Sequence, residues 1–303
     1  MTAPELLLRA RGQQLEVGRR PLLMGIVNAS PDSFSDGGRH PDLDAQLALA
    51  AQLQRDGADI LDVGGESAST GRPVVSVQHE IELVAPLIER ICQELGALVS
   101  IDTYKPAVAA AAIEAGAAII NDVSGLRDRA LADVSARSGA ALVVMHTRAA
   151  PRERLQDPDL YDDVGSEVLA FLAERIELAV AAGVRPEQIV VDPGPDFAKT
   201  PAQTIQLLRD VERLHALGRP LLMAISRKDF IGALTGRAPR ARLAGTLAAL
   251  AYGADRGAHM FRVHDVAAAA DFLAVRAALA GELDPGRNLA LGEEIRYDRL
   301  TAE

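Results

Sequence analysis

The chain has 303 residues, of which 49% are hydrophobic and 3% aromatic, and it contains no tryptophan. Its formal net charge of -10 and pI near 5.2 argue against binding to nucleic acid or to an anionic membrane surface. No apolar run approaches the roughly 18 residues that a membrane helix needs. A single cysteine excludes a disulfide and a thiolate metal cluster. We therefore expect a cytoplasmic protein that acts on small molecules.

Residues 5–17 alternate leucine with polar residues and predict a short N-terminal β-hairpin. After the hairpin, short apolar runs alternate with alanine-rich amphipathic stretches. The apolar runs, expected to be strands, are 21–27, 59–61, 98–101, 117–120, 140–145, 189–191, 220–225 and 258–261. The amphipathic stretches, expected to be helices, are about 43–56, 77–95, 106–115, 129–138, 163–182, 201–217, 240–256 and 266–280.

This alternation predicts a (β/α)8 barrel over about 21–280, within a single domain 1–303 whose tail 282–303 is polar. A doubly wound open sheet is the alternative. That fold would usually carry a G-x-G-x-x-G turn after its first strand. Residues 28–32 read Asn-Ala-Ser-Pro-Asp instead, which favours the barrel.

Every predicted strand ends in residues that can bind a ligand or titrate. They are Asn28, Asp62, Glu66, Asp102, Asn121, Asp122, His146, Asp192, Ser226, Arg227, Lys228, Arg262 and His264. Active sites of barrel enzymes are built from the C-terminal ends of the strands, so the pattern predicts an enzyme. The long connections 28–42, 65–76 and 147–162 leave the same face and are candidate lids, the first with Phe34 as an apolar contact.

Cationic or titratable residues gather at the ends of the last two predicted strands. Arg227, Lys228, Arg262 and His264 lie there in an otherwise acidic chain. This corner of a barrel, with a helix N-terminus beside it, is a frequent phosphate site. Ser226 is a candidate cap for a helix that starts near Lys228. Surface salt bridging is the alternative use of these charges.

Asp102, Asn121 and Asp192 end the third, fourth and sixth predicted strands. An ionised Asp only accepts hydrogen bonds, whereas Asn both donates and accepts. The trio therefore suits the edge of a flat heterocycle such as a pterin or a purine, with Met145 as an apolar wall. For Asp192 alone, an ordinary turn is an equal alternative.

Asn28 and Asp32 follow the first predicted strand. Oxygen ligands of this kind suit Mg²⁺, which keeps several waters and takes one or two protein ligands together with substrate phosphates. An Asx turn or a helix cap is the alternative role for each residue.

Seven segments resemble, in the same order, the motifs of the dihydropteroate synthase family. They are 24–38 (MGIVNASPDSFSDGG), 62–67 (DVGGES), 100–103 (SIDT), 120–125 (INDVSG), 192–194 (DPG), 226–228 (SRK) and 262–266 (RVHDV). The resemblance covers about 21–280. It implies a homodimeric barrel enzyme of folate biosynthesis that joins 6-hydroxymethyl-7,8-dihydropterin pyrophosphate to p-aminobenzoate, forming 7,8-dihydropteroate and pyrophosphate.

Position by position, the resemblance also implies roles for individual residues. The pterin would be bound by Asp102, Asn121, Asp192 and Lys228, in a pocket lined by Met145 and Phe197. Pyrophosphate would be bound by Arg262 and His264, with Mg²⁺ on Asn28. Asp32, on the first loop, would stabilise the pterin cation left when pyrophosphate departs.

The acceptor side departs from the family pattern. The residues assigned to it are Phe34, Ser67, Ala68, Ser69, Arg72 and Asp229. After Glu-Ser the family usually continues Thr-Arg-Pro-Gly, whereas here the guanidinium comes only at Arg72, in a longer loop. Asp229 replaces the usual Ser at the helix end that receives the acceptor carboxylate. Two like charges about 4 Å apart repel by about 4 kcal/mol, unless Asp229 turns away or is screened.

Residues 196 and 198 also differ, because the family commonly has glycine at both positions and this chain has Asp196 and Ala198. Alternatives to the synthase are therefore a pterin-binding homologue without synthase activity and an enzyme that uses another amine. A methyl-transferring pterin barrel and a lyase with a Schiff base on Lys228 are minor alternatives.

Overall fold

The computed structural model describes residues 6–29, 43–66, 74–292 and 295–296. The N-terminal hairpin consists of β1 (Leu6–Ala10) and β2 (Gln13–Val17), paired antiparallel. Eight further strands form a parallel sheet: β3 (Leu22–Asn28), β4 (Ile60–Gly64), β5 (Leu98–Asp102), β6 (Ile119–Asp122), β7 (Ala141–Met145), β8 (Ile189–Asp192), β9 (Leu222–Met223) and β10 (Met260–Val263). The predicted (β/α)8 barrel and hairpin are confirmed.

The strands follow the order β8-β7-β6-β5-β4-β3-β10-β9, and a parallel bridge between Val191 and Leu221 joins the two ends of the sheet. Val, Ile and Leu fill the strands because both faces of a parallel sheet are buried. β9 is shorter than the predicted strand 220–225. Among the described residues, none of the helices has the length and apolar character needed to cross a membrane.

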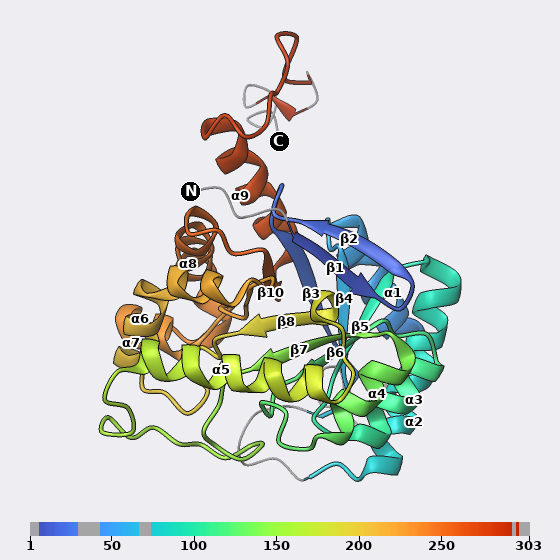
Figure 1. Cartoon of the computed structure of the whole chain (residues 1–303). Coiled ribbons are helices and arrows are strands. Elements are labelled where there is room, and N and C mark those ends of the chain that lie inside the picture. The colour runs from blue at the N-terminus through green and yellow to red at the C-terminus, as the bar shows by residue number, and fades with distance from the viewer. Residues whose placement is uncertain (1–5, 30–42, 67–73, 293–294, 297–303) are drawn as a thin grey trace.

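Helices surround the sheet (Figure 1). They are α1 (Leu43–Arg55), α2 (Val77–Arg90), α3 (Pro106–Glu114), α4 (Ala130–Ser138), α5 (Val164–Ala181), α6 (Pro201–Arg209), α7 (Asp229–Thr235), α8 (Leu243–Asp255) and α9 (Val266–Leu279). The helix predicted over 77–95 continues from α2 into a π-helical turn, Ile91–Leu95. The one predicted over 201–217 stops being α-helical after Arg209 and continues as a 3₁₀ segment, Val211–Leu217.

The hydrophobic core has two parts. One lies between the strands and the helices, and the other fills the barrel interior. Leu8, Ala10 and Val17 of the hairpin pack with the interior cluster, where they meet Met24 and Met260. The hairpin therefore closes one end of the barrel (Figure 1), which leaves the opposite end, where the strands terminate, for binding.

Candidate functional site

A cavity of about 310 Å³ opens at the C-terminal ends of the strands. Its walls come from nearly every strand end: Ile26, Asn28, Gly64, Glu66, Asp102, Asn121, Val123, Met145, Asp192, Phe197, Ala224, Ser226, Lys228, Arg262 and His264. We call it the strand-end pocket. It brings together nine residues that the sequence assigned to substrate or metal: Asn28, Asp102, Asn121, Met145, Asp192, Phe197, Lys228, Arg262 and His264.

Strand pairing sets the levels of the carboxylates and the amide in the pocket, and Asp192 lies two residues beyond the level of Asn121. Asp102 on β5 is aligned with Asn121 on β6, and Met145 on β7 with Asp192 on β8. The Asn121 amide donates to Asp62 Oδ2 at 3.1 Å, which fixes its orientation. Carboxylate oxygens and an amide thus line one wall, as recognition of a heterocycle edge requires.

Arg262 is held inside the barrel by two carboxylates. Its Nε donates to Asp62 and its Nη2 donates to Asp102, each at 2.6 Å. Asp62 is fully buried on β4. Because Nε and Nη2 serve this network, Nη1 is the nitrogen of Arg262 that these bonds leave for a ligand. Asp62 ends a predicted strand, yet no role was predicted for it. A carboxylate buried near Asp102 needs a cationic partner, and this need could have identified Asp62 from the sequence.

Burial shifts the titration of the pocket. It raises the pKa of Asp192 to about 6, although the Gly194 N–H donates to Asp192 Oδ1 at 2.7 Å and Lys228 lies near. Burial also raises the pKa of Asp102, with Arg262 opposing the rise. The pKa of the Lys228 ammonium is lowered by burial. Titratable groups with shifted pKa values in one cavity are typical of a functional site.

The predicted cationic group divides in two. Lys228, Arg262 and His264 line the strand-end pocket, whereas Arg227 pairs with Asp265 through bonds of 2.6 and 3.1 Å. Desolvation, together with the charges of Arg227 and Arg262, lowers the pKa of His264 to about 4. His264 is therefore neutral at pH 7, so it offers a hydrogen-bonding ring rather than a charge.

Ser226 does not cap α7, contrary to the sequence prediction. Its hydroxyl bonds the His264 ring at 2.9 Å and accepts from the His264 backbone N–H. Lys228 is the N-cap residue of α7 and makes no side-chain cap bond. Ser226 therefore orients His264 at the mouth of the pocket.

The loop that follows β8, residues 193–200, supplies the aromatic wall of the strand-end pocket, and we call it the β8 loop. The Lys228 Nζ lies 4.2 Å from the centre of the Phe197 ring. Beneath it, the fully buried Lys199 donates to the carbonyls of Gly194 and Phe197 at 2.9 and 3.0 Å. Lys199 also contacts His146 Nδ1 at 2.8 Å, and burial lowers the pKa of Lys199 to about 7. Sequence reasoning gave Lys199 no role, yet it fixes the loop that carries Phe197.

A second cavity of about 290 Å³ adjoins the strand-end pocket, and we call it the acceptor-side cavity. The two share the walls Glu66, Asp102, Val123 and Phe197. Its other walls come from Glu80 on α2, Thr103 and Tyr104 after β5, the segment 147–156, the β8 loop and Asp229. The predicted lid 147–162 thus borders this cavity.

Asp229 turns its side chain toward α8. Its Oδ1 accepts from Arg242 Nη1 at 3.0 Å, and the same nitrogen donates to the carbonyls of Arg227 and Lys228. The backbone N–H of Asp229 donates to the carboxylate of Asp196 at 2.5 Å. Asp196 and Ala198 have φ of 66° and 50°, in the left-handed region that favours glycine, so this loop keeps a glycine-type conformation without glycine.

Six predicted site residues lie outside the described part of the chain: Asp32, Phe34, Ser67, Ala68, Ser69 and Arg72. Asn28, the predicted metal ligand, ends β3 with its side chain exposed. Within the described ranges, no three His, Cys, Asp or Glu side chains gather closely enough to hold a metal ion.

Comparison with known proteins places the chain in a family. A family model described as pterin binding enzyme matches residues 24–264. The dihydropteroate synthase of Bacillus subtilis is 41% identical over 260 residues, which span 86% of this chain and 88% of that protein.

Two solved structures of Xanthomonas albilineans dihydropteroate synthase are similar throughout the barrel. The structure with 4-aminobenzoic acid has a TM-score of 0.84 and 44% identity, covering 91% of this chain and 98% of that one. The complex with 7,8-dihydropteroate has a TM-score of 0.80 and 43% identity, with 90% and 98% covered. The chain belongs to the dihydropteroate synthase family of pterin-binding enzymes.

Proposed function

We propose that this protein is a dihydropteroate synthase, a transferase that condenses 6-hydroxymethyl-7,8-dihydropterin pyrophosphate with p-aminobenzoate. The products are 7,8-dihydropteroate and pyrophosphate. The observation that carries the proposal is the strand-end pocket, in which heterocycle-binding groups, Asp102, Asn121 and Asp192, lie beside Lys228 and Arg262. Family membership supports the same reaction.

The reaction breaks the bond between the exocyclic methylene and the pyrophosphate oxygen, and the electron pair leaves with pyrophosphate. The arylamine nitrogen then bonds the methylene and loses one proton. Lys228 and Arg262 would stabilise the departing anion, while the buried carboxylates Asp102 and Asp192 would hold the pterin as its charge develops. Asp32 would assist from the first loop. This division of charge requires no nucleophile from the protein.

Mg²⁺ is proposed as the cofactor, with Asn28 as its protein ligand. The exposed Asn28 side chain lines the strand-end pocket together with Arg262 and His264, so an amide oxygen is available where the pyrophosphate would lie. Bound there, Mg²⁺ would neutralise phosphate charge. One amide oxygen suits an ion whose other ligands are waters and substrate phosphates.

A homodimer is proposed as the assembly. Ile205, Phe230, Leu234, Ala249 and Tyr252 are among the residues that line an apolar groove of about 350 Å³ on α6, α7 and α8. Leu234 is 68% exposed in that groove. Exposed apolar surface of this kind suits a second copy of the chain. Light scattering should report a dimer whose dissociation constant rises in Leu234→Lys.

The cytoplasmic location stays a prediction from the sequence.

The synthase proposal is tested by turnover. Purified protein with the pterin pyrophosphate, p-aminobenzoate and Mg²⁺ should release pyrophosphate and form 7,8-dihydropteroate. Folded protein that binds the pterin pyrophosphate but forms no product would identify a pterin-binding homologue without synthase activity.

A further inference from the structure

The acceptor-side cavity is where the proposed reaction would admit the arylamine, because it adjoins the strand-end pocket. This cavity shares the walls Val123, Asp102 and Phe197 with the strand-end pocket, so a molecule in it would lie beside a bound pterin. The charges around the acceptor-side cavity therefore act on the second substrate.

Most charges around this cavity are paired. Its carboxylates are Glu66, Glu80, Asp102, Glu153, Asp196 and Asp229, against the guanidinium groups of Arg152 and Arg154. Lys105 pairs with Glu66 and Glu80, Arg262 with Asp102, and Arg242 with Asp229. Within the described residues, Glu153 and Asp196 form no salt bridge. Of these two, Asp196 directly precedes Phe197, on the wall shared with the strand-end pocket.

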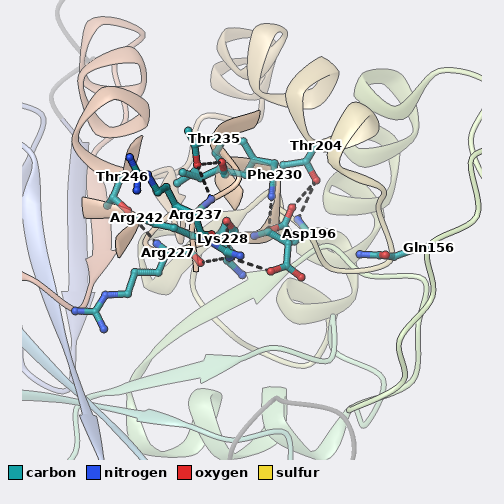
Figure 2. Close-up of polar contacts among 12 residues, drawn as sticks. Gln156, Asp196, Thr204, Arg227, Lys228, Phe230, Thr235, Arg237, Arg242 and Thr246 are labelled. Carbon is teal, nitrogen blue, oxygen red and sulfur yellow. Dashed lines mark hydrogen bonds and ion pairs between the residues drawn. The ribbon is translucent and has the colours of Figure 1, made fainter. Parts of the chain in front are cut away.

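Asp196 is held by hydrogen bonds, and its charge also interacts with the ammonium groups of Lys228 and Lys199. Its Oδ2 accepts from the backbone N–H groups of Asp229 at 2.5 Å and Phe230 at 3.4 Å, at the start of α7. Its Oδ1 accepts from the Thr204 hydroxyl at 3.1 Å (Figure 2). A carboxylate thus occupies the N–H groups at the start of α7, where Asp229 lines the acceptor-side cavity, and it takes their hydrogen bonds from any incoming carboxylate.

We propose that Asp196 is a specificity-determining residue for the amine acceptor. Its carboxylate competes with, and repels, a carboxylate on the acceptor. Arylamines with a carboxylate therefore bind more weakly than uncharged arylamines of the same shape. The inference rests on the proposed function, since it concerns the second substrate of that reaction.

The experiment compares 4-aminobenzoate with 4-aminobenzamide, which differ at one end by a charge. KM for each is measured from pyrophosphate release in wild type, Asp196→Asn and Asp196→Gly. Asn tolerates the left-handed backbone and keeps the Thr204 contact, whereas Gly removes the side chain at a φ that favours glycine. The matched control Glu153→Gln removes one negative charge from the same cavity and retains an oxygen that can accept from the Ala150 N–H.

The expected wild-type preference is for 4-aminobenzamide. Asp196→Gly should lower KM for 4-aminobenzoate by about tenfold or more, because a hydrogen bond to a charged group contributes about 1.5–3 kcal/mol. KM for 4-aminobenzamide should change by less than about twofold, since a neutral end recovers little from the lost charge. The decrease in KM for 4-aminobenzoate in Asp196→Asn should lie between the decreases in Asp196→Gly and Glu153→Gln. Equal changes for both acceptors, or an equal effect of Glu153→Gln, would overturn the role of Asp196.

Failure of the proposed function gives a different result. In that case no variant releases pyrophosphate with either acceptor. The affinities for 4-aminobenzoate and 4-aminobenzamide are then measured by calorimetry on protein loaded with the pterin pyrophosphate. A gain in 4-aminobenzoate affinity confined to the Asp196 variants supports the inference, and its absence overturns it.

Discussion

The two adjoining cavities are built from different parts of the barrel. The strand-end pocket takes Asp102, Asn121 and Asp192 from the ends of β5, β6 and β8, where strand pairing fixes their positions. The acceptor-side cavity takes most of its walls from the segment 147–156, the β8 loop and the start of α7. Strand ends place side chains rigidly, whereas loops leave charge and spacing free to change. The comparison implies that first-substrate binding is tied to the stability of the barrel and that acceptor binding is not.

The largest expected effect tests that link directly. Arg262→Met removes the partner of the fully buried Asp62 and should lower the free energy of unfolding by about 3–5 kcal/mol. Asp62→Asn in the same chain should recover part of the loss, because no unpaired carboxylate is then buried. Urea unfolding of the single and double variants gives the coupling between the two residues.

The matched control is Arg90→Met on α2. Arg90 also contacts two carboxylates, Asp44 at 2.5 Å and Glu94 at 2.6 Å, but both acidic partners are exposed. Loss of Arg90 should change the free energy of unfolding little, because water screens both ion pairs. Equal losses for Arg90→Met and Arg262→Met would break the claim that the strand-end pocket is part of the core.

The next prediction separates binding from stability in one residue. Asp192→Asn should weaken binding of the pterin pyrophosphate by about a hundredfold, since charge-assisted hydrogen bonds to the heterocycle are lost. The same change should raise the free energy of unfolding at pH 7 by about 1–3 kcal/mol. The gain follows because burial raises the pKa of Asp192 to about 6, so its ionised form disfavours the fold above that pH. Calorimetry and urea unfolding measure the two quantities.

A pH series sharpens the same point. Asp192 is ionised above about pH 6 and neutral below it. Affinity for the pterin pyrophosphate should therefore fall by about tenfold for each pH unit below 6. Stability should change in the opposite sense, decreasing as pH rises from about 4 to 6, because the folded state binds more protons than the unfolded state in that range. Asp192→Asn should flatten this part of both profiles, and an unchanged profile would assign the titration to another group.

The sequence predicted the strand-end pocket better than its surroundings, for physical reasons. Apolar runs identify parallel strands, and the strand ends of a barrel meet at one face, so Asp102, Asn121 and Asp192 could be placed together from the chain alone. The pairing of side chains could not be predicted in this way. Whether Arg227 bonds a ligand or Asp265 depends on a loop backbone with φ of 58°. That geometry follows from tertiary packing, which no local pattern encodes.

The acceptor side shows the same limit more sharply. Asp229 was the residue expected to repel an acceptor carboxylate, because it begins a helix where the family has Ser. The structure places Asp196 at those N–H groups instead, from a position 33 residues earlier in the chain. Substitution of a glycine-type position by Asp is visible in the sequence. The direction in which its carboxylate points is not.

The smallest expected effect completes the comparison at Asp229. Asp229→Ser removes a carboxylate that is 57% exposed and paired with Arg242, so the free energy of unfolding should change by less than about 1 kcal/mol. KM for 4-aminobenzoate should fall by less than about threefold, since Arg242 already balances the Asp229 charge and Asp196 still covers the N–H groups of α7. Steady-state kinetics beside Asp196→Gly measures the contrast. A larger gain from Asp229→Ser than from Asp196→Gly would move the control of acceptor binding from the β8 loop to α7 itself.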